Sequence, residues 1–226
     1  MEIIIRNSRS KKKIDIEPSI VSIDSIYYLD IANNIVNDYN AIYVKENLFF
    51  INDTVKNELD VFNLIDEGMI SKIFKIFDID DEFLSRDIKS LSYSEKVILN
   101  IIRSLKDSKY IIFDSVINKL DYIYRKKFIK FFDFLKNNDY YVFLINDEID
   151  FYYQNADYSL VWNSKKYIFD NTYDLYNDVG ELIKNKMNVP TLPYITYQAK
   201  EKYNVKLFYS KDVRDIIKDI YKHVKH

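Results

Sequence analysis

Residues 91–121 constrain the fold more than any other part of the chain. Ser92 and Glu95 have the spacing of a capping box, in which two side chains satisfy the free N–H groups at the start of a helix. Apolar residues then recur at helical spacing, and an uninterrupted apolar run follows at 110–113. An uninterrupted apolar run that follows a helix is typical of a parallel strand that is buried on both faces. We therefore expect an α/β fold.

Composition limits the chemistry that this fold can carry. The chain has 226 residues, two glycines, no cysteine and two histidines. Phosphate loops need several glycines, because their backbone takes positive φ and approaches the phosphates closely. Gly68 and Gly180 are far apart, so a glycine-rich nucleotide loop cannot form. The lack of cysteine excludes thiolate metal sites and thiol nucleophiles, and His223 and His226 both lie at the end of the sequence.

Charge and hydropathy exclude two further classes of protein. The net charge is −2 and the acidic and basic residues are interspersed, so we expect no nucleic-acid partner. The basic run at 6–13 is interpreted as a solvated hairpin turn. No apolar run approaches the about 20 residues that a membrane-spanning helix needs. We expect a protein that is soluble or that reaches a membrane only through other proteins.

Three short strings in residues 91–121 resemble the signature and Walker B segments of ABC-type ATPases. The family's LSGGQ is similar to residues 91–95, its hydrophobic-hydrophobic-Asp-Glu to residues 112–115, and its SGLD turn to residues 118–121. Arg103 matches an arginine of the family. The resemblance implies a P-loop NTPase-like ABC nucleotide-binding domain with a mostly parallel central sheet, an embedded helical subdomain and a C-terminal helical extension.

The resemblance and the periodicity together predict the domains and their elements. The predicted domains are a degenerate ATPase core at 1–51 and 91–177, a helical subdomain at 52–90 and a helical dimerisation extension at 178–226. Strands are predicted at 1–5, 19–23, 41–44, 110–113, 141–145, 160–163 and 166–172. Helices, besides the one that Ser92 caps, are predicted at 54–65, 68–77, 81–88, 124–135, 178–188, 189–203 and 210–223.

The residues that perform the chemistry of the family are changed in this chain. Where a phosphate loop would follow the strand at 19–23, residues 24–30 contain neither glycine nor lysine. Asp24 and Asp30 at this position would repel a polyphosphate. The catalytic glutamate is replaced by Ser115, which has no charge to serve as a general base. We therefore expect no catalytic residue and no independent ATP hydrolysis.

Three more positions carry acidic residues. Glu46 stands at the position of the Q-loop glutamine, and Asp147 at that of the switch histidine. Asp114 matches the Walker B aspartate and is a vestigial Mg²⁺ position, since half of the site is missing. The alternative for Asp114 is a strand-end aspartate that caps a neighbouring turn.

Other matched positions belong to elements that act, in the family, on the nucleotide of the opposite subunit. These are Ser92, Ser94 and Asp121. A degenerate subunit could still offer its helix terminus to the phosphates of a partner. Against this, Tyr93 replaces a glycine that allows close approach, and Ser92 could be a helix cap only. We expect no cofactor on the isolated chain, with ATP and Mg²⁺ on the partner subunit.

Residues 178–226 resemble the tail of the ATPases of energy-coupling-factor (ECF) transporters, which take up vitamins and metal ions. In that family two ATPase subunits dimerise through these tails and grip a membrane T-subunit, while another membrane subunit binds the substrate. The resemblance implies these partners and a peripheral position at the cytoplasmic face of the cell membrane. The alternative is a helical extension packed on its own domain.

The resulting hypothesis is a pseudo-ATPase that transmits force as the heterodimer partner of a competent ATPase. Two alternatives stay open. The chain could be a weakly active ABC ATPase that shares composite ATP sites with a partner, or an interaction protein unrelated to transport.

Overall fold

The structure, a computed structural model, describes residues 2–7, 10–45, 47–61 and 67–224. Contacts divide the chain into two compact units: residues 1–20 with 29–145, and residues 21–28 with 146–226. The junctions fall inside β3 and α1, and each of these elements is described with the unit that holds most of it. The predicted domains at 1–51 with 91–177, 52–90 and 178–226 divide the chain at other places and stay a prediction.

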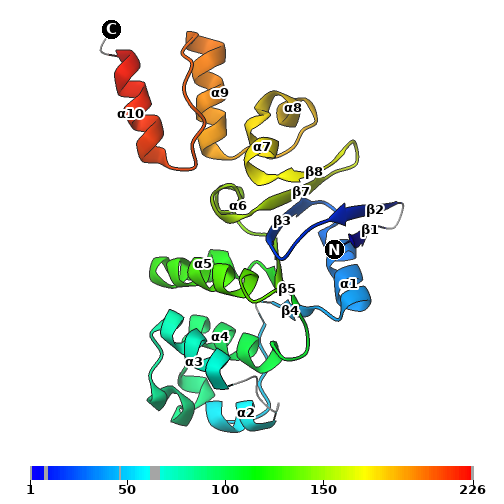
Figure 1. The fold of residues 1–226 in the computed structure, drawn as a ribbon, viewed down its shortest axis with the longest axis vertical. Helices are drawn as coiled ribbons and strands as arrows, with labels where there is room; N and C mark the ends of the chain where they lie inside the picture. Colours follow the sequence, from blue (N-terminus) through cyan, green and yellow to red (C-terminus); the bar gives the residue numbers. More distant parts are fainter. Residues whose placement is uncertain (1, 8–9, 46, 62–66, 225–226) are drawn as a thin grey trace. The chain divides into compact units, whose positions relative to one another are not determined.

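The first unit contains a two-stranded sheet, three further strands and five α-helices among its described residues (Figure 1). Its strands are β1 (Glu2–Arg6), β2 (Lys11–Asp15), β4 (Ile42–Val44), β5 (Tyr110–Asp114) and β6 (Tyr141–Ile145). Its helices are α1 (Tyr28–Tyr39), α2 (Val55–Val61), α3 (Glu67–Phe77), α4 (Tyr93–Ser104) and α5 (Tyr122–Lys136).

Parallel strands form the centre of the first unit. β5 lies between β4 and β6 and is parallel to both. Residues 111–113 of β5 and 142–145 of β6 have no exposed surface, which explains why both strands read as continuous apolar runs. Phe128 of α5 packs against Phe77 of α3, with ring centroids 5.0 Å apart, and Phe132 packs against Phe113 of β5 at 5.1 Å. The aromatic face of α5 is therefore core.

The amino-terminal hairpin corrects one expectation. β1 pairs antiparallel with β2, and Arg6 lies opposite Lys11, so the predicted turn at 6–13 is shorter and its lysines belong to a strand. Ile3, Ile5 and Ile14 are buried beneath the hairpin, which explains why the strands extend through charged residues. The Ile4 N–H donates to the hydroxyl of Tyr39 at the end of α1.

The predicted helix at 81–88 is wrong. The chain forms two short 3₁₀ turns there, Asp81–Ser85 and Ile88–Ser90. The carboxylate of Asp80 accepts from the Phe83 N–H, and that of Asp87 accepts from the Lys89 N–H. Each aspartate starts its own turn, because a short acidic side chain competes with the helical hydrogen bonds of the backbone.

The second unit contains three strands and five α-helices among its described residues (Figure 1). Its elements are β3 (Ile20–Ser25), α6 (Ile149–Asn155), β7 (Tyr158–Trp162), β8 (Tyr167–Asn171), α7 (Thr172–Asn177), α8 (Val179–Lys184), α9 (Thr191–Tyr203) and α10 (Val213–Val224). β3 and β7 are parallel, and β8 closes this part of the sheet as an antiparallel strand. The mostly parallel sheet that the sequence predicts is confirmed.

Two helices of the tail are shorter than expected. The helix predicted at 178–188 ends at Lys184, because Lys186 takes a left-handed conformation with φ 56°. The helix predicted at 210–223 begins only at Val213, since the Ser210 hydroxyl accepts from the Asp212 N–H and forms a turn first. None of the described helices is long and apolar enough to cross a membrane.

Candidate functional site

The end of β3 is the place where a phosphate loop would begin. Here the strand passes into α1 through a turn at residues 26–27. The Ser25 hydroxyl accepts from the Tyr27 N–H at 3.0 Å and donates to the carbonyl oxygen of Trp162 at 2.7 Å. The Tyr27 ring packs edge-on against Trp162, with centroids 5.6 Å apart. No residue from 24 to 30 has positive φ, so this turn has no concave row of N–H groups for an anion.

A cavity of ≈ 300 Å³ lies beside this turn, within the second unit. Its lining residues are Ile23, Asp24, Ser25, Asn146, Asp147, Ile149, Tyr152, Asn188 and Val189. The Asn188 side-chain amide donates to both carboxylate oxygens of Asp24, at 3.2 and 3.0 Å. The Asp147 N–H donates to the Tyr152 hydroxyl at 2.8 Å. The structure thus brings two predicted acidic positions, Asp24 and Asp147, into one cavity.

The electrostatics of this cavity are unfavourable to a nucleotide. Burial raises the pKa of Asp24, and the hydrogen bond from Asn188 only partly opposes that effect. Burial, together with the nearby Asp147, raises the pKa of the Tyr152 hydroxyl far above its usual range. None of the described residues that line the cavity is basic. A polyphosphate would therefore meet like charge without a compensating cation.

Asp114 lies at the carboxyl end of β5, in the first unit, as the resemblance implies. The Tyr43 hydroxyl, from β4, donates to Asp114 Oδ2 at 2.7 Å, and the Ser115 hydroxyl donates to Oδ1 at 3.2 Å. Ser115 takes a left-handed conformation with φ 57°. Among the described residues, no cluster of three or more acidic or histidine side chains could hold a metal ion. The carboxylate of Asp114 is instead held by neighbouring hydroxyls.

The start of α4 has the predicted capping box. The Ser92 hydroxyl accepts from the Glu95 N–H, and Glu95 Oε2 accepts from the Ser92 N–H at 2.7 Å. Arg86 binds the other carboxylate oxygen of Glu95 at 2.6 Å. Burial favours the neutral acid, but the hydrogen bonds from Ser92 and Arg86 prevail and lower the pKa of Glu95. A negative charge thus already lies at this helix terminus, where an anion would bind.

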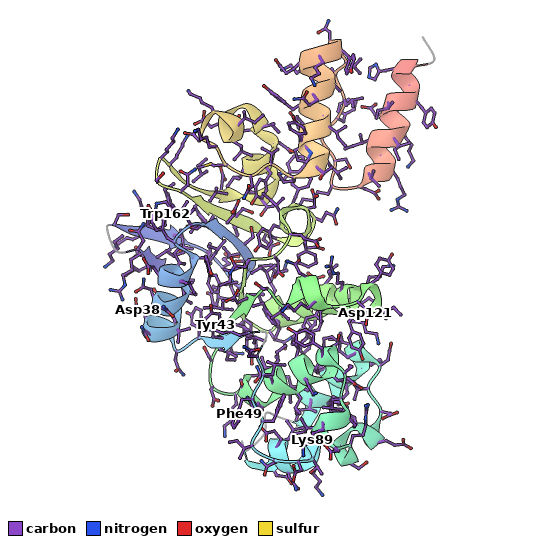
Figure 2. The ribbon with its side chains drawn as sticks, turned by 180° about the vertical axis from the view of Figure 1, so that it is seen from behind. Asp38, Tyr43, Phe49, Lys89, Asp121 and Trp162 are labelled. Atoms are coloured by element: carbon purple, nitrogen blue, oxygen red, sulfur yellow. The ribbon has the colours of Figure 1, made fainter. Side chains whose placement is uncertain are left out.

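The remaining predicted positions differ in accessibility. Ser94 is only 6% exposed. Asp121 is exposed and caps α5, where its carboxylate accepts from the Tyr124 N–H at 2.9 Å (Figure 2). Glu46 lies outside the described residues. The contacts of Ser92, Ser94 and Asp121 with a partner's nucleotide stay predictions.

Sequence reasoning missed a buried polar cluster around Glu58, in the first unit. Glu58 is fully buried and accepts from the N–H groups of Ile51 and Asn52, at 3.0 and 2.9 Å. Its other carboxylate oxygen forms an ion pair with Arg103. Hydrogen bonds from Asn52 and Arg103 outweigh burial and lower the pKa of Glu58. The signal was present, since Glu58 stands among apolar residues on the inner face of a predicted helix.

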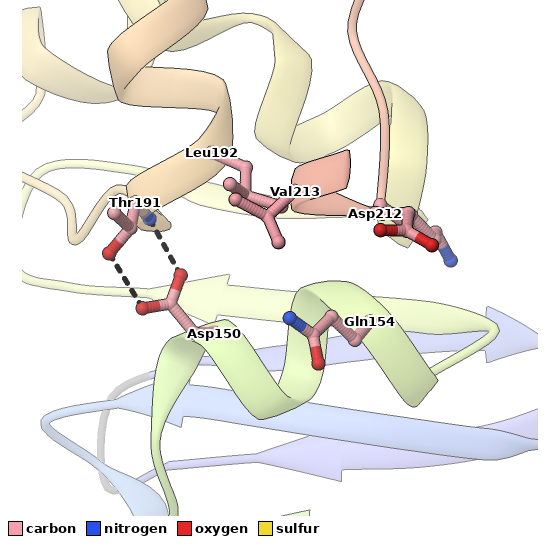
Figure 3. Close-up of a pocket in the computed structure, with 7 residues that line it drawn as sticks. Asp150, Gln154, Thr191, Leu192, Asp212 and Val213 are labelled. Carbon is pink, nitrogen blue, oxygen red and sulfur yellow. Dashed lines mark hydrogen bonds between the residues drawn. The ribbon is translucent and has the colours of Figure 1, made fainter. Parts of the chain in front are cut away.

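A second cavity of the second unit, of ≈ 460 Å³, lies at the starts of α9 and α10 (Figure 3). Its lining residues are Asp150, Gln154, Thr191, Leu192, Lys211, Asp212 and Val213. Asp150 accepts from the N–H and the hydroxyl of Thr191, at 2.6 and 2.7 Å. Asp212 accepts from the Arg214 N–H at 2.8 Å. Both carboxylates cap the start of a helix, so we assign this cavity no chemistry.

These elements together define a class of fold. A capped helix that leads into a buried parallel strand, an aspartate at the end of that strand and a second aspartate-capped helix follow the order of an ABC nucleotide-binding domain. Solved structures of that class match the chain. The chain therefore has the fold of an ABC nucleotide-binding domain.

Two solved structures illustrate the likeness. The first is CbiO1 from Clostridium perfringens, part of the ABC transporter complex CbiONQ. It is 14% identical with a TM-score of 0.60, and the match covers 86% of this chain and 96% of that chain. The second is an inward-facing putative metal-chelate type ABC transporter, at 12% identity and a TM-score of 0.56, covering 77% of this chain and 81% of that chain. No protein-family model and no curated protein matches the sequence.

Proposed function

We propose that this chain is a degenerate ATP-binding-cassette subunit of an ECF-type transporter for vitamins or metal ions. In this role it transmits force and supports a competent ATPase subunit, and it does not hydrolyse ATP alone. The observation that carries the proposal is the end of β3. There the Ser25–Tyr27 hydrogen bond closes the turn, and Asp24 and Asp147 stand without a basic residue among the described lining. The chain therefore has the fold, but this turn offers a phosphate neither a row of N–H groups nor a basic side chain among the described lining.

The competent subunit would hold ATP and Mg²⁺. Ser92 and Asp121 are both exposed at helix starts, which leaves them accessible to a nucleotide on another chain. The buried Ser94 would support Ser92 from within the helix and not by direct contact. Asp114, Glu46 and Asp147 stand at positions that, in the family the sequence resembles, act on the nucleotide of the same subunit, and we propose no catalytic role for them here.

The tail offers a surface for the second ATPase subunit. Along α10, large apolar side chains are exposed on one face: Val213, Ile217, Ile220 and Tyr221. The charged residues beside them pair within the helix, as in Lys218 with Asp215 at 3.2 Å. An apolar stripe flanked by charges that are already paired suits another helix of the same kind.

The proposal of membrane partners is supported by a structural neighbour. CbiO1, the structural neighbour, is part of a larger transporter complex. The proposed membrane partners are an integral T-subunit and a substrate-binding membrane subunit. We propose a peripheral position at the cytoplasmic face.

Co-purification tests this proposal. The tagged protein is extracted from membranes of its native host in mild detergent, and its companions are identified by mass spectrometry. We expect an ABC ATPase with an intact phosphate loop together with an integral membrane protein. An Ile217→Glu, Ile220→Glu variant should lose the ATPase, whereas the control Lys200→Glu, on the exposed side of α9, should keep it. Recovery of the chain without either companion would contradict the proposal and favour an interaction protein unrelated to transport.

One observation favours a second candidate, a weakly active ATPase with composite sites. Asp114 keeps both its residue type and its place at the end of β5. This candidate requires Mg²⁺-dependent ATP binding at sites that both subunits form, so Asp114→Asn in the co-purified complex should lower the number of ATP molecules bound in calorimetric titration.

A further inference from the structure

The cavity of ≈ 300 Å³ at the end of β3 has the wrong charge for a phosphate but the right charge for a small cation. It contains the carboxylates of Asp24 and Asp147, and none of its described lining residues is basic. Asp24 is half-buried, and its hydrogen bonds from Asn188 come from a neutral amide. A partly desolvated carboxylate is stabilised by a cation that also supplies N–H donors. A ligand that suits this cavity is therefore positively charged.

Tyr152 provides a second and independent indication of a ligand. Its side chain is only 2% exposed, and its hydroxyl oxygen accepts from the Asp147 N–H at 2.8 Å. The hydrogen of this hydroxyl has no acceptor among the residues that the structure describes. Leaving a buried donor unpaired costs free energy, so such groups normally have a partner. Because Tyr152 and Asp147 both line the cavity, an oxygen atom of a ligand inside it could accept this hydrogen.

An ammonium group suits the cavity better than a metal ion. Mg²⁺ and Ca²⁺ take about six or more oxygen ligands. Among the described residues, no group of three or more acidic or histidine side chains could hold such an ion. An ammonium group has only three N–H donors, and it needs no more than two carboxylates and one neutral oxygen. Asp24, Asp147 and the side-chain oxygen of Asn188 offer that set.

The remaining wall of the cavity is aliphatic. Ile23, Ile149 and Val189 line it together with the polar side chains. Asn188 is exposed, so solvent reaches the cavity beside it. Binding sites for small molecules commonly combine apolar walls with a few polar groups that fix the orientation of the ligand. A short chain of methylene groups would lose contact with water against these three side chains.

We infer that this cavity binds a small aliphatic amino alcohol. The ammonium group lies between the carboxylates of Asp24 and Asp147, and the hydroxyl oxygen of the ligand accepts from the Tyr152 hydroxyl. The methylene groups between them pack against the aliphatic wall. The inference goes beyond the proposed function and does not depend on it, because every lining residue belongs to the second unit of this chain.

Titration calorimetry on the purified full chain at pH 7.5 tests the inference. The probes are ethanolamine, 3-amino-1-propanol and 4-amino-1-butanol, and we expect at least one of them to saturate a single site. The tightest of the three is then compared with two analogues of equal length. In one a methyl group replaces the hydroxyl group, which should raise the dissociation constant by about fivefold. In the other a hydroxyl group replaces the amine, which should raise it by about tenfold or more.

The analogues also distinguish the ligand from water. If the methyl analogue binds as tightly as the amino alcohol, the Tyr152 hydroxyl does not contribute and the inference is overturned. The inference is also overturned if none of the three amino alcohols saturates a site. Either result would leave the proposed function unchanged, because that function is tested by co-purification and not by amine binding.

Asp24→Asn tests the position of the ammonium group. The substitution keeps the shape of the side chain and removes its charge, so the dissociation constant of the amino alcohol should rise by about tenfold or more. Weaker binding would not be due to unfolding, because removing this charge should stabilise the chain at pH 7.5. The matched control is Asp107→Asn, an exposed carboxylate in the first unit, which should leave binding unchanged. Equal dissociation constants for the two variants would overturn the inference.

Discussion

At the scale of single residues, Asp24 departs furthest from what a nucleotide site requires. Its carboxylate is half-buried at the end of β3, and Asn188 supplies its hydrogen bonds. The raised pKa means that the folded protein takes up a proton here more readily than the unfolded chain. The free energy of unfolding therefore falls as the pH rises from 3.8 through the raised pKa.

Because the free energy of unfolding falls as the pH rises, replacing Asp24 with a neutral residue should stabilise the protein. Asp24→Asn keeps an oxygen that can accept from Asn188 and removes the buried charge. At pH 7.5 the Asp24→Asn protein should have a higher free energy of unfolding than the parent. At pH 4 the difference between the two free energies should be smaller. Urea unfolding at both pH values measures this difference. The control Asp107→Asn changes an exposed carboxylate and should show no advantage at either pH. An Asp24→Asn variant that is no more stable at pH 7.5 would contradict the account.

The hydrogen bond between Tyr43 and Asp114 gives a second prediction. Tyr43→Phe removes the 2.7 Å hydroxyl contact and should lower the free energy of unfolding by about 1.5 kcal/mol, the usual size for a hydrogen bond to a charged group. Tyr221→Phe removes a hydroxyl from an exposed side chain on α10 and should leave the urea midpoint unchanged. Equal midpoints for the two variants would show that Tyr43 does not hold Asp114.

The residue types at the candidate site could be predicted from the sequence, whereas their hydrogen-bond partners could not. Asp114 and Asp121 stand at a strand end and a helix start, which local pattern alone indicates. The contact of Tyr43 with Asp114 joins residues 71 apart in sequence, and that of Asn188 with Asp24 joins residues 164 apart. Such pairs depend on which strands become neighbours, and a single sequence does not encode that in any local signal.

At the scale of elements, the start of α4 depends on its capping box. Ser92→Ala removes the acceptor for the Glu95 N–H and should cost about 1 kcal/mol of stability, while Ser92→Thr should retain most of it. Thermal unfolding measures both. Ser164→Ala, an exposed serine between β7 and β8, is the control and should leave the midpoint unchanged. A Ser92→Ala protein that melts with the parent would show that the cap contributes nothing.

Strands were predicted better than helix ends, for a physical reason. The apolar run at 141–145 coincides with β6, because burial on both faces permits no polar residue inside it. The errors at 81–88 and 210–212 arise where Asp80, Asp87 or Ser210 form their own turns. Short polar side chains can either cap a helix or replace its first turn, and the sequence pattern alone does not distinguish the two.

At the scale of the whole molecule, the architecture and the chemistry reside in different residues. The buried middle residues of the parallel strands and the phenylalanine face of α5 hold the fold, whereas Asp114 and Asp24 lie at the ends of β5 and β3. The chemistry of ABC-type ATPases resides at strand ends and turns, where Asp24, Ser115 and Asp147 stand here. A likeness of fold therefore persists at 14% identity to a structural neighbour and does not by itself determine which residues form a site.

Equilibrium binding of ATP to the purified chain, measured by titration calorimetry with and without Mg²⁺, tests the central claim most directly. A competent ABC ATPase measured in the same buffer serves as the positive control. The account predicts no saturable binding tighter than about 1 mM, equivalent to about −4 kcal/mol, with or without the metal. A micromolar dissociation constant that depends on Mg²⁺ would contradict it.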